Sequence, residues 1–398
     1  MATCGQCKVK LHTDVGFYTS VETPHFDMRT RETARKFLEQ GVGDGYVRLA
    51  CQVRVEKDVS LYLSKDTLHV KKYSARVIKK IPITSDKMEL WLKPSKPIQY
   101  KPGQYIQLAI PEDFAEEHYK KYGDLIKEAC QKLGKEFVPY VAGTTLYRGY
   151  SLASVEPDLL KLIVRMAPVD PCMPLEKGGP PCIGPSCVHN YIQEQSLWNF
   201  FLGEKIRFTG PYGHFMLKEQ PHTAVFVAGG AGLAPILALL EQWFKEGRQD
   251  KAIFFLGERR FQDIPTVYLP KWLKWERANP NFQFVPVLSG AFRGDNPAEM
   301  NDVDKKCFYN VSEGDRQIIK EQGLVDEQGD QWKGQVGFIG PLLRKYLSPD
   351  PDIAFYLCGP APMTVTVIDS AANALNLKKE NALFDDFTGT LTPSVDLL

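Results

Sequence analysis

Three cysteines near the start of the chain have the types and spacing of iron–sulfur ligands. Cys4 and Cys7 are separated by two residues, and Cys51 lies in the segment RLACQV. Plant-type [2Fe–2S] clusters are held by four thiolates, three in the order C-x4-C-x2-C and a fourth far along the chain. Cys4, Cys7 and Cys51 would be the second, third and fourth ligands. Alone, the pair fits a zinc half-site, a redox pair or an inert pair as well.

A second group with chemical potential lies in the segment LYRGYSLAS. It contains Arg148, Tyr150 and Ser151 on an expected strand, where side chains alternate between the two faces. The Arg148 guanidinium could bind a pyrophosphate, the Tyr150 ring could stack on a planar ring, and the Ser151 hydroxyl could bond its edge. As a bare pattern, the segment fits an exposed arginine beside an ordinary strand tyrosine equally well.

A third group is a glycine loop between an apolar strand and a helix, in the segment VFVAGGAGLAP. Gly229, Gly230 and Gly232 allow close approach of a ligand to the backbone, and the start of the following helix favours a diphosphate. The alternative is a glycine-rich turn without a ligand. Near the end of the chain, YLCGPAPM places Cys358 at the carboxyl end of another strand, where open α/β sheets bind ligands. A buried structural thiol is the alternative for Cys358.

A further set of thiols stands in a Gly/Pro-rich segment at residues 170–187. The spacing C-x9-C-x4-C-x-H matches no metal motif, so a loop with incidental thiols is the expectation, with a zinc or iron–sulfur site as the alternative. The residues are Cys172, Cys182, Cys187 and His189.

The elements that would position these groups change in kind along the chain. Residues 46–63, 74–109 and 159–215 contain runs that are typical of strands, whereas residues 112–134 are charged and periodic and predict a helix. From Thr223 onward, strands and helices alternate, which predicts parallel βαβ units. A chain of 398 residues is also long enough for two or three domains.

Composition excludes several classes of protein. The 49 basic and 48 acidic residues nearly cancel, so there is no bias toward nucleic acid or a membrane surface. Nine cysteines in a large chain argue against a secreted disulfide framework, and Lys8 and Lys10 interrupt the first apolar stretch, so no secretory signal is expected. Residues 223–240 carry no charge, but three glycines and a proline interrupt them, so we expect strand, loop and helix, not a membrane span.

The motifs occur in an order that resembles a known superfamily. R-x-Y-S is followed by G-P-Y-G at residues 210–213, by G-G-x-G-L-A-P and by C-G-P-x-x-M. This order resembles the ferredoxin–NADP reductase superfamily and, with an N-terminal cysteine segment, its three-domain oxygenase reductases. Five further segments make the chain similar to the F-type subunits of the sodium-translocating NADH:quinone oxidoreductase. They are CGQCKVK, RLACQV, the long insert before RGYS, GFIGPLL and LFDDFTG.

The resemblance implies a multidomain fold of α/β and β type. An incomplete ferredoxin-like [2Fe–2S] domain would span residues 1–70. An FAD-binding antiparallel β-barrel would span residues 71–218, and an NAD(P)-binding doubly wound parallel sheet would span residues 219–398.

The resemblance also implies roles for the residues named above. Arg148 would bind the FAD pyrophosphate, Tyr150 would pack on the flavin ring and Ser151 would bond near its reactive nitrogen. The glycines would face the NADH diphosphate, and the segment Cys358-Gly359-Pro360 would lie by the nicotinamide. Phe387 would cover the flavin. His189 and Asn190 stand where the family places small hydroxyl residues on the FAD phosphates, so Asn190 is the candidate there. The implied catalytic residues are Ser151, Cys358 and Phe387, and the implied metal ligands are Cys4, Cys7 and Cys51.

Two features of the family are absent at the start of this sequence. No cysteine precedes Cys4, and no membrane-spanning helix precedes the cysteine segment. We expect a reading frame that begins upstream of Met1 to explain both, and the alternative is a real loss of the cluster. The choice of nicotinamide coenzyme also stays open: Glu258 in LGERR suits the ribose hydroxyls of NADH, whereas Arg259 and Arg260 suit a 2′-phosphate.

The expected function is an NADH-dependent oxidoreductase and flavoprotein for electron transport. Its cofactors would be FAD, NADH and [2Fe–2S], and its partners would be NADH and a downstream acceptor protein or quinone-reductase complex, with no nucleic acid and no membrane span. The alternatives are a soluble reductase component of an oxygenase and a non-catalytic flavin-fold module. We expect a cytoplasmic location, at most peripheral on the cytoplasmic face of the inner membrane.

Overall fold

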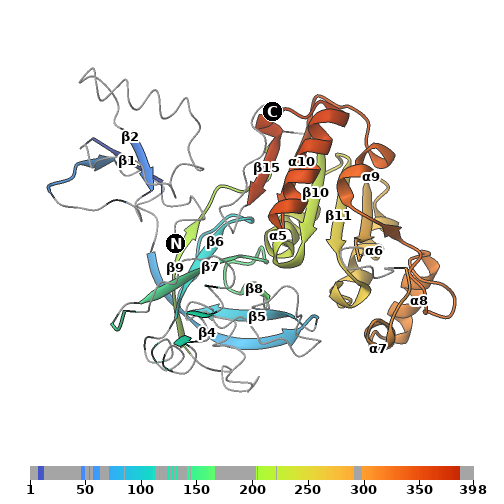
Figure 1. The fold of residues 1–398 in the computed structure, drawn as a ribbon, viewed down its shortest axis with the longest axis horizontal. Coiled ribbons are helices and arrows are strands. Elements are labelled where there is room, and N and C mark those ends of the chain that lie inside the picture. Colours follow the sequence, from blue (N-terminus) through green and yellow to red (C-terminus); the bar gives the residue numbers. More distant parts are fainter. Residues whose placement is uncertain are drawn as a thin grey trace.

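The structure is a computed structural model, and its described part contains two large sheets that lie side by side (Figure 1). The described residues are 8–12, 46–49, 53, 57–62, 71–84, 86–110, eight positions between 112 and 131, 141–143, 145–165, 203, 205–220, 222–290 and 298–385.

The first large sheet is antiparallel and has the strand order β7-β6-β9-β4-β5-β8. Its strands bury one face, as the alternation of buried and half-buried residues along YIQLAI shows, and this face encloses a core of Val77, Leu90, Leu108 and Phe208. The strands are β4 (Lys71–Pro82), β5 (Lys87–Pro94), β6 (Tyr105–Ile110), β7 (Leu146–Ser151), β8 (Leu160–Arg165) and β9 (Lys205–Tyr212). This near-barrel sheet confirms the expectation of antiparallel strands in the middle of the chain.

The second large sheet is parallel and has the order β13-β12-β11-β10-β14-β15. β10 and β14 are buried along almost their whole length because helices cover both faces of the sheet, as parallel sheets require. The strands are β10 (Thr223–Gly229), β11 (Ala252–Glu258), β12 (Phe282–Leu288), β13 (Gln335–Val336), β14 (Ile353–Cys358) and β15 (Ala382–Asp385).

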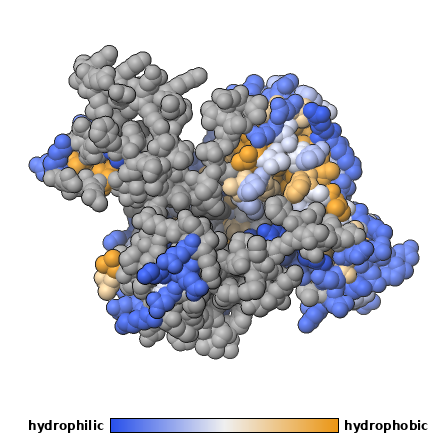
Figure 2. Space-filling model, viewed as in Figure 1, coloured by the Kyte–Doolittle hydropathy of each residue, from blue (hydrophilic) through white to orange (hydrophobic). Residues whose placement is uncertain are grey.

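Two hydrophobic clusters lie on the two faces of the parallel sheet. On one face, Phe226 and Phe254 pack with Trp243 and Trp272 of α5 (Leu233–Lys245) and α6 (Leu269–Ala278). On the other face, α9 (Ile339–Tyr346) and α10 (Ala361–Leu375) contribute apolar side chains to the second cluster. Two short charged helices, α7 (Asp302–Tyr309) and α8 (Glu313–Glu321), lie at one end, where Figure 2 shows mostly hydrophilic atoms.

The run at residues 223–240 is β10, a 3-10 turn η4 (Gly230–Gly232) and the first part of α5. The expectation of strand, loop and helix is therefore confirmed. No helix in the described ranges is long and apolar enough to cross a membrane.

A small sheet near the start of the chain has the order β2-β1-β3. It consists of β1 (Lys8–Leu11), β2 (Tyr46–Leu49) and β3 (Leu61–Tyr62), so strands do form within residues 46–63. The described positions between 112 and 131 are helical, in agreement with the expected helix.

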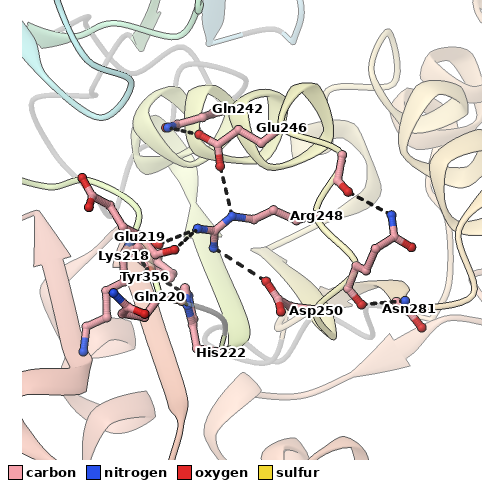
Figure 3. A network of polar contacts seen from close by, with 12 residues as sticks. Lys218, Glu219, Gln220, His222, Gln242, Glu246, Arg248, Asp250, Asn281 and Tyr356 are labelled. Carbon is pink, nitrogen blue, oxygen red and sulfur yellow. Dashed lines mark hydrogen bonds and ion pairs between the residues drawn. The ribbon is translucent and has the colours of Figure 1, made fainter.

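The segment that connects β9 to β10, and so joins the two large sheets, is held to the parallel-sheet part by hydrogen bonds. Arg248 Nη2 donates to the carbonyl oxygens of Lys218 (2.7 Å) and Glu219 (3.1 Å) (Figure 3). The Tyr356 hydroxyl accepts the Lys218 N–H at 2.9 Å and lies 2.9 Å from His222 Nε2. Because His222 Nδ1 lies 2.7 Å from the Gln220 carbonyl, this nitrogen carries the proton and Nε2 accepts from Tyr356.

Candidate functional site

The R-x-Y-S segment forms β7, and its pairing with β6 fixes the direction of each side chain. Leu108 pairs with Arg148, Ile106 with Tyr150 and Tyr105 with Ser151. Because strand side chains alternate, Arg148 and Tyr150 share one face of β7, and both are half-buried. Arg148 Nη1 donates to the Tyr147 carbonyl at 2.7 Å. One ligand can therefore contact both the guanidinium and the ring.

Ser151 connects the two sheets. Its side chain is buried, and its hydroxyl donates to Asp385 Oδ2 at 3.3 Å. Asp385 ends β15, the strand that pairs with β14 in the parallel sheet. The end of β7 and the end of the parallel sheet therefore meet in one place. Asp385 was not singled out in the sequence, although it lies in the segment LFDDFTG.

The glycine loop lies at the carboxyl ends of the parallel strands. Ala228 at the end of β10 pairs with Cys358 at the end of β14, so the two predicted motifs are adjacent. A Cβ on Gly232 would lie 2.0 Å from the Cys358 carbonyl oxygen, and a Cβ on Gly359 would lie 2.4 Å from Met363 Cε. The position of Gly232 therefore requires glycine for close packing of the loop against the backbone of the other motif.

Cys358 is fully buried. Its backbone forms the wall against which Gly232 packs, and Pro360 immediately precedes α10. The position at the end of β14 is the one expected from the sequence.

Charged side chains lie buried where the two large sheets meet, and the sequence did not predict them. Lys87 at the start of β5 and Glu258 at the end of β11 form an ion pair, with 3.1 Å between Nζ and Oε1. Arg165 at the end of β8 pairs with Asp86, with 2.7 Å between Nε and Oδ2. Lys161 on β8 forms a further contact with Glu241 on α5, at 3.6 Å.

Burial and neighbouring charges shift the pKa values of this cluster in opposite directions. Desolvation raises the pKa of Glu258 above its ordinary value, although Lys87 and Arg165 act to lower it. For Asp86, desolvation acts to raise the pKa, but Lys87 and Arg165 outweigh it and the pKa is lowered. Desolvation also lowers the pKa of Lys161, against the charges of Glu241 and Glu89.

The Glu258 carboxylate is not placed as the sequence suggested. It accepts the Gly230 N–H at 3.2 Å and contacts Lys87, and the residue is only 8% exposed, which argues against a contact with a ribose. Arg260 donates to Asp304, whereas Arg259 is exposed.

Several predicted site residues lie outside the described residues. They are Cys4, Cys7, Cys51, Cys172, Cys182, Cys187, His189, Asn190 and Phe387. Within the described ranges, no group of three or more His, Cys, Asp or Glu side chains could hold a metal ion.

An antiparallel near-barrel sheet with R-x-Y-S on one strand, beside a parallel sheet with a glycine loop, defines a class of flavin- and nicotinamide-dependent reductases. The chain resembles the ferredoxin–NADP reductase-like superfamily in these features, as its motifs suggested, and it contains an oxidoreductase NAD-binding domain. The model of the oxidoreductase NAD-binding domain matches residues 226–317.

Comparison with known proteins adds particular relatives. The chain is 29% identical over 402 residues to the F-type subunit of the Na(+)-translocating NADH-quinone reductase of Psychrobacter arcticus, covering 97% of this chain and 82% of the relative. The corresponding protein of Klebsiella pneumoniae is 28% identical, with the same coverage. These similarities confirm the resemblance to the F-type subunits.

Solved structures share the fold at low sequence identity. A cytochrome P450 reductase from Amycolatopsis superposes with a TM-score of 0.60 and 19% identity, covering 97% of this chain and 88% of that one. The ferredoxin reductase of a carbazole 1,9a-dioxygenase superposes with a TM-score of 0.55 and 17% identity, covering 97% and 87%. Both share the overall fold of this chain.

Proposed function

We propose that this chain oxidises NADH and passes the electrons through FAD and a [2Fe–2S] cluster to an external acceptor. The observation that carries the proposal is the junction where β7, β15 and the glycine loop meet. The hydrogen bond between Ser151 and Asp385 joins the strand expected to bind flavin to the sheet expected to bind nicotinamide. Such proximity is what transfer between two bound cofactors requires.

The residues on β7 fit FAD. Arg148 offers a guanidinium that can bind a pyrophosphate in bidentate fashion, and Tyr150, on the same face, offers a ring for stacking. The bond from Ser151 to Asp385 is long, at 3.3 Å, so this hydroxyl can turn toward a ring nitrogen without a large loss. When bound, FAD supplies the conversion between two-electron and one-electron transfer.

The loop on the parallel sheet fits the diphosphate of NADH. Gly229, Gly230 and Gly232 precede the first turn of α5 and leave the loop without side chains, and the partial positive charge of this helix end favours anions. Gly359 and Pro360 lie beside the loop, at the end of β14, and would border the nicotinamide. Cys358 and Phe387 remain the proposed catalytic contacts, together with Ser151.

We propose Cys4, Cys7 and Cys51 as cluster ligands within a ferredoxin-like domain of residues 1–70. The FAD domain would span residues 71–218 and the NAD domain residues 219–398. The similarity to the F-type subunits over 97% of the chain supports this division. Asn190 is proposed for the FAD phosphates.

The proposed acceptor is a quinone-reducing membrane complex, because the sequence relatives are named as parts of an NADH-quinone reductase. The alternative acceptor is an oxygenase, since one structural neighbour is named as the reductase of a dioxygenase. On the first proposal the chain works at the cytoplasmic face of the inner membrane, and on the second it works in the cytoplasm. NADH-dependent reduction of a soluble quinone, compared with that of an oxygenase component, distinguishes them.

The experiment that tests the whole proposal is an anaerobic titration of the purified, FAD-loaded chain with NADH. Visible absorption and EPR spectra are recorded together. We expect the flavin absorption to bleach; a reduced [2Fe–2S] signal would mean that another residue supplies the remaining cluster ligand. A chain that does not bind FAD, or whose flavin absorption stays unchanged with NADH, would refute the proposal. Bleaching without an EPR signal would mean that Cys4, Cys7 and Cys51 alone do not hold a cluster.

A further inference from the structure

Two oppositely charged side chains from different sheets meet behind the glycine loop. Lys87 begins β5 of the antiparallel sheet, and its side chain is completely buried. Its Nζ lies 3.1 Å from Glu258 Oε1 and donates to the Asp263 carbonyl at 2.8 Å. A buried ammonium is stable only with such partners, so Glu258 and the Asp263 carbonyl hold Lys87 at this place.

Glu258 contacts the loop directly. The same oxygen that pairs with Lys87 accepts the Gly230 N–H at 3.2 Å. From the other side, Arg165 Nη1 lies 3.0 Å from the position that a Cβ on Gly230 would occupy. Gly230 therefore lies between a carboxylate and a guanidinium. Its φ of +57° is one that glycine adopts readily.

The charges that face Glu258 are balanced. Lys87 and Arg165 are the cations, and Asp86 is the other carboxylate, which pairs with Arg165 at 2.7 Å and lies 3.7 Å from Lys87. Asp263 gives its carbonyl to Lys87, while its carboxylate accepts the Arg260 N–H and acts on Arg165. The two cations Lys87 and Arg165 and the two carboxylates Glu258 and Asp86 balance one another, and the Asp263 carboxylate is a third acid that acts on Arg165.

This balance matters because the site is buried and the expected ligand is anionic. Charges in a protein interior are poorly screened, so an excess charge behind the loop acts on a ligand in front of it. A diphosphate carries two negative charges. Glu258 without its counter-ion would repel the diphosphate, whereas Lys87 without Glu258 would attract it.

We propose that Lys87 and Glu258 are a charge-balancing pair that sets the affinity of the glycine loop for the diphosphate of a nicotinamide dinucleotide. The inference rests on the proposed function, because it assumes that the loop binds such a ligand. It assigns a positioning role to Glu258, which acts through Gly230, and it makes a residue of the antiparallel sheet part of the nicotinamide site.

The test is NAD⁺ binding, measured by calorimetry on the FAD-loaded chain at pH 8.5 and low salt. The variants are Lys87→Met, Glu258→Gln and the double variant. We expect Lys87→Met to bind NAD⁺ about tenfold more weakly and Glu258→Gln to bind it several-fold more tightly. The double variant, with its charge balance restored, should return to within about threefold of the wild type.

The opposite signs separate this role from a structural one. If the pair only held the loop in shape, both single variants would bind NAD⁺ more weakly, and that result would overturn the proposal. Equal affinity in all variants would overturn it as well. If Lys87→Met does not fold, Glu258→Gln decides alone, since only charge balance predicts tighter binding.

A matched control is Lys161→Met, which removes another buried lysine from the junction of the sheets. Lys161 pairs with Glu241 on α5 and is 5% exposed. We expect this variant to lower the thermal midpoint without changing NAD⁺ affinity; an equal affinity loss in Lys161→Met would overturn the specific role of Lys87. A wild-type chain that binds no NAD⁺ would refute the proposed function itself.

Discussion

Tyr150 belongs to the proposed flavin site, whereas the buried pair Tyr356–His222 stabilises the segment that connects the two large sheets. Tyr150 lies half-buried on β7 beside the core of the antiparallel sheet. Tyr356 is fully buried in β14, where desolvation raises its pKa to about 12, so its hydroxyl stays protonated as a donor to His222. One residue faces the proposed flavin, and the other fixes the connection between the sheets.

Replacing Tyr150 by Ala should weaken FAD binding about tenfold, because the ring supplies stacking and buried area. The dissociation constant follows from fluorescence quenching as FAD is added to the apoprotein. Tyr147→Ala is the matched control, since Tyr147 lies on the opposite face of the same strand and is 37% exposed. Unchanged FAD affinity in Tyr150→Ala would remove Tyr150 from the site.

Replacing Tyr356 by Phe should lower the free energy of unfolding by about 2 kcal/mol. The change leaves the Lys218 N–H and His222 Nε2 without their partner. Urea unfolding measures the difference. In the control Tyr309→Phe, the lost hydroxyl is on a residue that is 52% exposed, and the expected change is within about 0.5 kcal/mol. Equal effects would show that the hydroxyl of Tyr356 contributes nothing specific.

His222 should make stability depend on pH. Desolvation lowers its pKa in the folded chain below the ordinary value of 6.5, so the unfolded chain binds the proton more readily. The folded state is therefore destabilised as the pH falls below about 6.5, until the folded-state pKa is passed. The free energy of unfolding at pH 7.5 and 5.5 should differ less in His222→Gln than in the wild type. An equal difference would contradict this prediction.

At the scale of elements, the contact between the glycine loop and the end of β14 fixes the geometry of the site. Gly232 of η4 lies against the Cys358 backbone, and no side chain fits between them. The loop can therefore present its backbone to a ligand only if both elements keep this separation.

Gly232→Ala should lower the free energy of unfolding by about 2 kcal/mol, because the added methyl group would lie 2.0 Å from the Cys358 carbonyl oxygen. NAD⁺ binding should weaken as well. The control is Gly314→Ala in α8, where a Cβ meets nothing within 4 Å and alanine should stabilise the helix by about 0.5 kcal/mol. A neutral Gly232→Ala variant would show that the two elements can separate freely.

The sequence predicted these elements well, because their signals are local. The glycines of VFVAGGAGLAP and the apolar strand before them are close together in the sequence, as are the members of R-x-Y-S. The ion pair of Lys87 with Glu258 and the bond of Ser151 with Asp385 join residues far apart in the sequence. A lysine at the start of a strand ordinarily indicates solvent exposure, so no local pattern could place Lys87 in the interior.

At the scale of the whole molecule, buried ion pairs and packed side chains join the two large sheets. Lys161 lies between Trp91 of the antiparallel sheet and Tyr268 near α6, 5.4 Å from the centre of each ring, and it also pairs with Glu241. Such an interface couples the unfolding of one sheet to that of the other.

We expect flavin release and tryptophan fluorescence to report one unfolding transition in the wild type. Four of the six tryptophans, Trp243, Trp272, Trp275 and Trp332, lie in the parallel-sheet part, whereas bound flavin would report on the antiparallel sheet. In Lys161→Met the two transitions should separate along the temperature axis. Coincident transitions in this variant would show that other contacts carry the coupling.

The hydrogen bonds from Arg248 to the Lys218 and Glu219 carbonyls restrict how the two large sheets can move relative to each other. Because Arg248 holds Lys218 and Glu219 and Tyr356 holds His222, this part of the connecting segment is bonded to the parallel-sheet part. The first half contains Gly213, whose φ of +94° suits glycine and whose neighbour is the Tyr105 ring. Any rotation of one sheet against the other would also have to break the Lys87–Glu258 and Lys161–Glu241 ion pairs between them.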